Sequence, residues 1–174
     1  MKSHIISFCK EQAGYTLIEL MAAMVITGLI GLGATISTFQ VLTQTSKNSD
    51  YVTANRNAMN ALHWISRDAM MAQTMNGVDD FPQNGTLSLS WVEWDNTTHT
   101  ANYSLENGSL FRIYSDDSQV TRTLVAEYIN PDVNSTFCSS DNGVLTVTIT
   151  SSVGEGSRVV DAKRVRETVL RPEL

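Results

Sequence analysis

Histidine and cysteine are the residues of this sequence that could serve a nucleophilic site, and there are few of them. The 174 residues include three histidines and two cysteines. A cysteine–histidine site needs the two side chains to converge, so that the imidazole can take the proton of the thiol. Cys138 follows Phe137 in a serine-rich loop, His99 lies in a threonine-rich segment, and His63 lies on a predicted helix, as a surface or packing residue. Nothing in this spacing favours convergence, so we do not expect an enzyme or a small-molecule substrate.

Aspartates are the candidate metal ligands, because calcium prefers oxygen donors. Those in predicted loops are Asp79, Asp80, Asp116, Asp117, Asp132 and Asp141. Their spacing matches no recognised calcium loop. Aspartates in such a pattern are more often solvated residues of turns than calcium ligands. Two cysteines are also too few for a zinc site with four cysteine ligands. We therefore expect neither a metal nor a cofactor.

A long uncharged segment near the N-terminus points to a membrane rather than to catalysis. No charged residue occurs from Leu20 to Ser46, and these positions would span about 40 Å as a helix, more than a hydrocarbon core of about 30 Å. The apolar core of a secretory signal peptide is shorter, about 7–15 residues. Lipid attachment through Cys9 is disfavoured, because this cysteine precedes the apolar segment. Residues 15–46 are thus predicted to form one membrane helix, and Lys2 and Lys10 would hold its N-terminal end in the cytoplasm.

Glu19 is the charged residue at the edge of this apolar segment. A carboxylate carried to the centre of a bilayer costs about 2.5–3.5 kcal/mol, so such a residue is expected to have a partner. The alternative is that Glu19 complements its own helix N-terminus, where a negative charge is favourable. The two roles can coexist.

The residues from Gly14 to Glu19 read Gly-Tyr-Thr-Leu-Ile-Glu, and the apolar helix follows without a break. This resembles the cleavage and methylation motif of type IV prepilins and type II secretion pseudopilins, whose usual form is Gly-Phe-Thr-Leu-Ile-Glu. The sequence departs from that form in having Tyr15 for phenylalanine. The resemblance covers the leader and the first helix.

The resemblance implies a leader of residues 1–14 that a prepilin peptidase removes on the cytoplasmic side. Cleavage would fall between Gly14 and Tyr15, and the new amine of Tyr15 would be N-methylated. A glycine before the scissile bond suits this cleavage, because no Cβ keeps the protease from the backbone. Gly14 and Tyr15 would then be substrate residues of the peptidase. The resemblance also implies that Glu19 pairs with the N-terminal ammonium group of a neighbouring subunit.

The remaining sequence predicts an α+β fold with a long N-terminal helix packed on an antiparallel β head. Apolar residues at Val52, Met59, Leu62, Ile65 and Ala69 recur at helical steps, which predicts an amphipathic helix half over residues 47–76 that stops at Asn76-Gly77. Residues 77–174 are predicted to form the head. Its expected strands lie in 86–94 (with a bulge near Val92–Trp94), 102–105, 110–114, 120–129, 144–150 and 167–170, with a hairpin turn at Asn107-Gly108 and loops at 139–143 and 151–157. The order of these segments resembles the larger minor pilins of the J or W type, as does Arg67-Asp68-Ala69 late in the helix.

The charge of the chain limits its partners. The formal net charge is −6, so nucleic acid is not expected as a partner. Basic residues nevertheless gather near the C-terminus, at Arg158, Lys163, Arg164, Arg166 and Arg171. We interpret them as a solvated edge strand, since lysine and arginine discourage edge pairing. Contact with an acidic neighbouring subunit, or with DNA, is the alternative interpretation.

These observations together predict a minor pilin or pseudopilin subunit in the tip or body of a type IV pilus or type II secretion pseudopilus. It would first reside in the inner membrane, with its N-terminus in the cytoplasm and its head outside. Its partners would be the prepilin peptidase, other major and minor pilins or pseudopilins, and the membrane. The competing hypothesis is a monomeric, membrane-anchored extracytoplasmic binding domain that is not assembled into a fibre.

Overall fold

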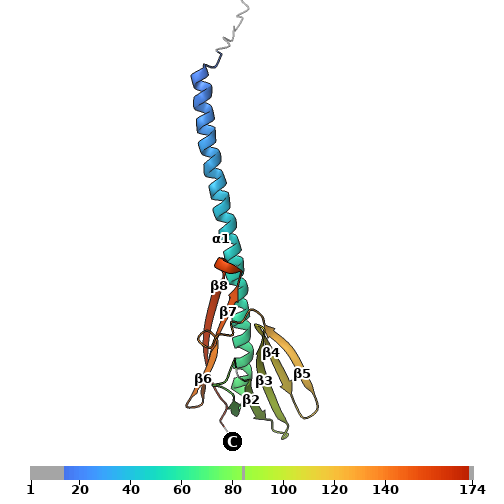
Figure 1. Ribbon diagram of the computed structural model, residues 1–174. Helices are drawn as coiled ribbons and strands as arrows, with labels where there is room; N and C mark the ends of the chain where they lie inside the picture. The colour runs from blue at the N-terminus through green and yellow to red at the C-terminus, as the bar shows by residue number, and fades with distance from the viewer. Residues whose placement is uncertain (1–13, 84, 173–174) are drawn as a thin grey trace, which may run out of the picture. The chain divides into compact units, whose positions relative to one another are not determined.

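The computed structural model describes residues 14–83 and 85–172, and the predicted leader up to Ala13 lies outside this range. One long helix, α1 (Leu17–Met71), precedes two antiparallel sheets (Figure 1). The strands are β1 (Thr74–Asn76), β2 (Leu87–Val92), β3 (Thr98–Glu106), β4 (Ser109–Ser115), β5 (Val120–Ala126), β6 (Phe137–Asp141), β7 (Val144–Val153) and β8 (Val160–Val169), with a short 3₁₀ helix, η1 (Gly156–Arg158). The predicted α+β class is confirmed. The chain forms two compact units, one reaching Gln44 and the other beginning at Thr45.

The unit that reaches Gln44 consists, over its described residues, of the first part of α1. Every described side chain from Gly14 to Gln44 is exposed, including the large apolar ones. The hydroxyls of Thr27, Thr35 and Thr38 donate hydrogen bonds of 2.8–2.9 Å to carbonyls four residues earlier. These bonds satisfy polar groups that an apolar environment would leave without a partner. The described part of this unit thus has no core of its own, and its apolar surface needs a cover from elsewhere.

In the second unit, α1 is buried along a face made mostly of alanine. The buried apolar residues of this face are Ala54, Ala58, Ala61, Leu62, Ile65 and Ala69. The prediction was right for Leu62, Ile65 and Ala69, but wrong for Val52 and Met59, which are exposed. Small side chains let the sheets approach the helix closely. A prediction that looks for large apolar residues does not identify a buried face made of alanine.

The helix ends at Met71, earlier than the predicted stop at Asn76-Gly77. Pairing with β2 takes the following residues out of the helix: the Gln73 amide donates to the Ser90 carbonyl at 2.9 Å, and β1 pairs with β2. Gly77 has φ +72° and lies against the backbone of Thr86, so that an added Cβ would come within 2.2 Å of the Thr86 oxygen. This glycine therefore serves a close approach of two backbone segments and does not end the helix.

The first sheet is a meander in the order β1-β2-β3-β4-β5. Asn107 and Gly108, with φ of 50° and 77°, form the predicted turn between β3 and β4, and their left-handed conformations match the twist of a hairpin. The bulge expected near Val92–Trp94 is instead a strand end at Val92. A register shift occurs between Leu110 and Phe111, where β4 pairs with β5.

The second sheet has the order β6-β7-β8 and is larger than predicted. A serine-rich segment expected as a loop contains β6, and Asn142-Gly143 forms a second left-handed turn between β6 and β7. β7 extends to Val153, into the predicted loop 151–157, and β8 begins at Val160 although only residues 167–170 were expected. These strands were not predicted, because their serine and charged residues interrupt the alternation of apolar and polar side chains that identifies a strand in a sequence. β8 is an edge strand, as interpreted from its basic residues.

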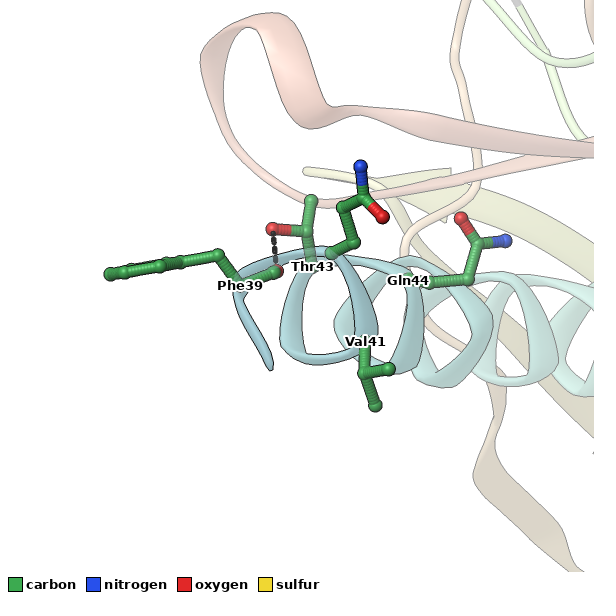
Figure 2. A pocket seen from close by; sticks show the side chains of 5 residues that line it. Phe39, Val41, Thr43 and Gln44 are labelled. Atoms are coloured by element: carbon green, nitrogen blue, oxygen red, sulfur yellow. Dashed lines mark hydrogen bonds between the residues drawn. The ribbon is translucent and has the colours of Figure 1, made fainter. Parts of the chain in front are cut away.

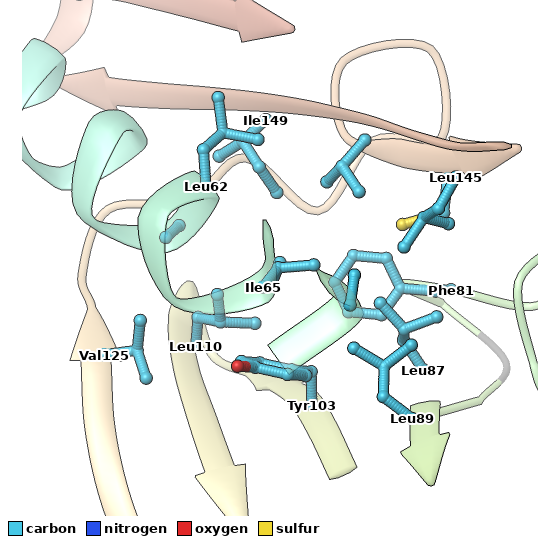
Figure 3. Packing of buried hydrophobic residues seen from close by; sticks show 14 of the residues in the cluster. Leu62, Ile65, Phe81, Leu87, Leu89, Tyr103, Leu110, Val125, Leu145 and Ile149 are labelled. Carbon is cyan, nitrogen blue, oxygen red and sulfur yellow. The ribbon is translucent and has the colours of Figure 1, made fainter. Parts of the chain in front are cut away.

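The segment after β5 joins the two sheets through its backbone. The Ile129 amide donates to the Gly108 carbonyl at 2.8 Å, and the Asn130 amide donates to the Thr150 carbonyl at 2.9 Å. Figure 3 shows the shared core, in which Leu62 and Ile65 of α1 lie between Ile149 of β7 and Leu110 of β4. Both sheets therefore pack on one helix in a single hydrophobic cluster.

A buried ion pair fixes the first sheet to the helix. Asp68 of α1 is fully buried, and its Oδ2 accepts hydrogen bonds from the Tyr103 hydroxyl at 2.6 Å and from Arg112 Nε at 2.5 Å. Tyr103 and Arg112 face each other across β3 and β4, so one carboxylate binds both strands. Burial and the negative charge of Asp68 raise the pKa of Tyr103, which therefore stays protonated as a donor.

Replacement of Asp68 by asparagine is expected to destabilise the head by about 3–5 kcal/mol, because it leaves the buried Arg112 charge without its partner. Urea unfolding of the full chain in detergent, followed by tryptophan fluorescence, measures this difference. Asp79→Asn, at an exposed position, is the matched control and should change stability little. Equal stability of the two variants would contradict the role given to Asp68.

Candidate functional site

The residues of the predicted processing site lie at the start of α1 and are accessible. Gly14 is exposed, and Tyr15 is 86% exposed. A Cβ added at Gly14 would meet no described atom within 4 Å. The packing of the described residues therefore does not require glycine at this position. An outside requirement, such as a protease that approaches the backbone, is consistent with this observation.

Glu19 forms a reciprocal cap with Thr16 at the helix N-terminus. The Thr16 amide donates to Glu19 Oε2 at 3.3 Å, and the Glu19 amide donates to Thr16 Oγ1 at 3.3 Å. This is the capping box, in which a threonine and a glutamate three residues later satisfy each other's free backbone donors. The role of Glu19 at its own helix end is therefore present in the single chain. The carboxylate remains at the exposed surface.

The structure does not join His63, His99 and Cys138 into a nucleophilic site. His63 is exposed on α1, as predicted. His99 lies on β3, buried, with its Nδ1 2.6 Å from the Tyr114 hydroxyl and its ring stacked on Trp91. Cys138 is buried on β6 rather than in a loop, and among the described residues no hydrogen bond joins it to a histidine.

Two of the aspartates expected in turns, Asp116 and Asp132, are used by the turns themselves, whereas Asp141 is the last residue of β6. Asp116 Oδ1 accepts hydrogen bonds from the amides of Ser118 and Gln119, and Asp132 Oδ1 accepts from the Asn134 amide at 3.0 Å. Over residues 14–83 and 85–172, no group of three or more His, Cys, Asp or Glu side chains could hold a metal ion. These carboxylates therefore serve as structural acceptors in the described chain.

A hollow of about 630 Å³ lies along α1 in the first unit (Figure 2). It is lined by Phe39, Gln40, Val41, Thr43 and Gln44. The Thr43 hydroxyl donates to the Phe39 carbonyl at 2.9 Å, so its proton is already engaged. The lining belongs to a single exposed helix and contains no acid or base, so the hollow has no features of a catalytic site.

Sequence reasoning missed Asp68, Tyr103 and Arg112 as a group, although these three residues hold the head together. The aromatic neighbours extend this group: the Arg112 guanidinium carbon lies 4.6 Å from the Tyr114 ring centroid and 5.3 Å from that of Trp64. A charged residue among the alanines of a buried helix face was the available signal. Its partners are 35 and 44 residues away in sequence and could not be paired without the fold.

We expect Cys138 to resist modification in the folded chain, because burial raises its pKa to about 12 and leaves little thiolate at neutral pH. Alkylation with iodoacetamide at pH 8, followed by peptide mapping that separates Cys9 from Cys138, tests this. Ser140→Cys, exposed on the same strand, should be labelled at least about a hundredfold faster than Cys138. Equal labelling of the two positions would contradict this expectation. It would show that the Cys138 thiol is accessible and could form a disulfide-linked dimer.

Comparison with known proteins gives a match to the N-terminal region. Residues 9–35 match the family model described as the prokaryotic N-terminal methylation motif. No curated protein and no solved structure matches the chain. Over the described residues, α1 is also long and apolar enough to cross a membrane. This chain therefore carries a prepilin-type N-terminal cleavage and methylation motif on an α+β fold with a long N-terminal helix.

Proposed function

We propose that the chain is a minor pilin or pseudopilin, processed by a prepilin peptidase and assembled into a type IV pilus or type II secretion pseudopilus. The observation that carries this proposal is the methylation motif at residues 9–35, which leads directly into an apolar helix without a core of its own. A membrane can cover that helix before assembly, and the helices of neighbouring subunits can cover it afterwards. The order of the segments supports a J or W type of minor pilin.

Processing would begin with the leader, residues 1–14, on the cytoplasmic side of the inner membrane. Residues 15–46 would cross the bilayer, and the head would lie outside. Cleavage after Gly14 would release the amine of Tyr15 for methylation. The exposure of both residues supports this order of events, since the peptidase needs access to the bond.

Assembly would then use Glu19 in a second role. In the single chain its carboxylate accepts hydrogen bonds from Thr16 at the helix N-terminus. The N-terminal ammonium of a neighbouring subunit would add an ion pair and offset the cost of placing this carboxylate among apolar helices. Pairing at one fixed residue would also set the axial register between subunits.

The competing function is a membrane-anchored binding domain that remains a monomer. Such a protein would need neither leader cleavage nor a glycine at position 14. The described packing gives no reason for glycine at position 14, whereas cleavage by a peptidase would give one, and this favours the processed subunit.

Replacement of Gly14 by valine is expected to block leader removal, because a β-branched side chain would hold the protease away from the scissile backbone. Co-expression with a prepilin peptidase and measurement of the intact mass would show the uncleaved chain. Gly28→Val is the matched control, since an added Cβ at Gly28 also meets no described atom within 4 Å. This control should be cleaved like the wild type. Normal cleavage of Gly14→Val would contradict the proposed processing site.

Replacement of Glu19 by glutamine separates its two roles, because a glutamine can complete the capping box but carries no charge. We expect normal helix content and normal leader removal. Recovery of the chain in sheared fibres should fall at least about tenfold, since the ammonium of the neighbour loses its partner.

Glu106→Gln, exposed in the head, provides the control for loss of one carboxylate and should assemble normally. Circular dichroism monitors the helix and immunoblotting of the fibre fraction measures assembly. Wild-type recovery of Glu19→Gln would leave helix capping as the whole function of this residue.

A further inference from the structure

The buried side chain of His99 has one ring nitrogen engaged and the other without a partner. The residue is 9% exposed, and its Nδ1 lies 2.6 Å from the Tyr114 hydroxyl oxygen. Its Nε2 is buried as well, and among the described residues it has no hydrogen-bond partner. A buried polar atom that is left unsatisfied costs free energy, so this nitrogen calls for an occupant beside it.

A carboxylate faces the free nitrogen. Oε1 of Glu93 lies 3.8 Å from His99 Nε2, which is too far for a hydrogen bond. The pairing of β2 with β3 explains this position, because Trp91 is the direct partner of His99 and Glu93 follows two residues later on the same side of the hairpin. The Glu93 amide donates to the Thr97 carbonyl at 3.0 Å, so the pairing continues beyond the end of β2 and holds the carboxylate near the ring.

The imidazole ring of His99 is fixed by its neighbours. It stacks on Trp91 with the ring centroids 5.5 Å apart, and the hydrogen bond with Tyr114 holds its Nδ1 edge. When Nδ1 carries the proton and donates to the Tyr114 oxygen, Nε2 keeps a bare lone pair beside the Glu93 carboxylate. A metal-bound histidine has this tautomer, with its second ring nitrogen donating to a fixed oxygen. The ring is therefore oriented as a metal ligand would be.

The charges around the ring favour a cation. Asp95 and Asp116 lie close enough to His99 for their charges to interact with it. Hydrogen bonds from backbone amides of their own turns lower the pKa of both carboxyls, so both are charged at neutral pH. The positive charge of Arg112, which stacks on the Tyr114 ring, is balanced by Asp68. With the carboxylate beside Nε2, three negative charges therefore act on the space next to this nitrogen.

We propose that His99 Nε2 and the Glu93 carboxylate bind a divalent transition-metal ion, of which zinc suits this ligand pair best. Imidazole nitrogen and carboxylate oxygen are common zinc ligands, with bonds of about 2.0–2.2 Å. Two such bonds in line add up to about 4.1 Å, more than the 3.8 Å between the two atoms, so an ion fits between them at a wide angle. A tetrahedral angle needs a separation of about 3.4 Å, which a small shift of the half-exposed Glu93 side chain supplies.

An ion at this site would be exchangeable. Two protein ligands leave the remaining coordination positions to water, whereas structural and catalytic zinc sites have four or three protein ligands. Because Glu93 is exposed, the ion has an entry path that does not require the head to unfold. Once bound, it would satisfy His99 Nε2 and stabilise this end of the first sheet. The inference goes beyond the proposed function and does not depend on it.

Urea unfolding with and without zinc tests the site. The full chain is purified in detergent without a polyhistidine tag, and His4→Gln with Cys9→Ser removes two other possible zinc ligands. We expect about 1 mM zinc chloride to raise the urea midpoint and EDTA to reverse the change, because an ion that binds only the folded chain stabilises it. Isothermal titration calorimetry of this parent chain with zinc measures the affinity.

Variants of the two ligands show where the ion binds. Glu93→Gln should lower the zinc affinity at least about tenfold, whereas Glu106→Gln, also exposed in the first sheet, should not change it. His99→Gln should abolish the zinc-dependent shift of the midpoint, whereas His63→Gln, at an exposed position of α1, should keep it. If His99→Gln does not fold, Glu93→Gln still decides the question, because Glu93 is exposed and makes no contact with the core.

The hydrogen bond that orients the imidazole has its own test. Tyr114→Phe keeps the aromatic ring and removes the oxygen that fixes the tautomer of His99. We expect it to lower the zinc affinity about 10–100-fold, as the loss of such a supporting partner does in other metal sites. Tyr128→Phe, at an exposed tyrosine outside this cluster, is the matched control and should bind zinc like the parent chain.

Two results would overturn the proposal. One is a urea midpoint of the parent chain that zinc does not change. The other is an equal zinc affinity of the parent chain and Glu93→Gln, which would show an adventitious ion only. Weaker binding in Glu93→Gln and Tyr114→Phe, with unchanged binding in Glu106→Gln and Tyr128→Phe, supports the site.

Discussion

A single buried carboxylate organises the head of this protein. Asp68 is carried by α1 into a core otherwise made of alanine and larger apolar side chains, where an unpaired charge would be very costly. Tyr103 and Arg112 satisfy it, and they are direct neighbours across β3 and β4. These contacts tie β3 and β4 to the helix at one point of their shared register. The alanines beside Asp68 allow the close approach that these short hydrogen bonds require.

This arrangement divides the tasks of α1 between its two parts. From Thr45 onward, one face of the helix is buried within the chain. Its contacts are the hydrophobic core and the group of Asp68, Tyr103 and Arg112, which we call the Asp68 cluster. Up to Gln44, its described side chains are exposed, although most of them are apolar. Such an apolar segment needs a cover that it does not supply itself. The methylation motif at residues 9–35 falls in this segment, and under the proposed function a membrane covers the segment first and neighbouring helices cover it later.

The sequence was sufficient for the fold class and for the hairpin at Asn107-Gly108, because both rest on local chemistry. The predictions were wrong for features that depend on contacts between residues far apart in the sequence. The helix stops at Met71 because the next residues pair with β2, and Val52 and Met59 are exposed because the alanine face binds the sheets. β6 was hidden in a serine-rich segment. At the candidate site, the sequence predicted Gly14, Tyr15 and Glu19 by their motif, and the alternative of helix capping by Glu19 is what the single chain shows. The Asp68 cluster could not be predicted, since its members meet only in the folded chain.

The central claim is that this chain is processed and assembled, and the intact mass of the chain recovered from purified surface fibres tests it most directly. Cells that express the chain with a prepilin peptidase and with a complete set of pilins or pseudopilins would supply the fibres. The account predicts a chain that begins at Tyr15 and carries one methyl group on its N-terminal amine. A chain found only in the membrane fraction with Met1 at its N-terminus, and absent from the fibres, would contradict it.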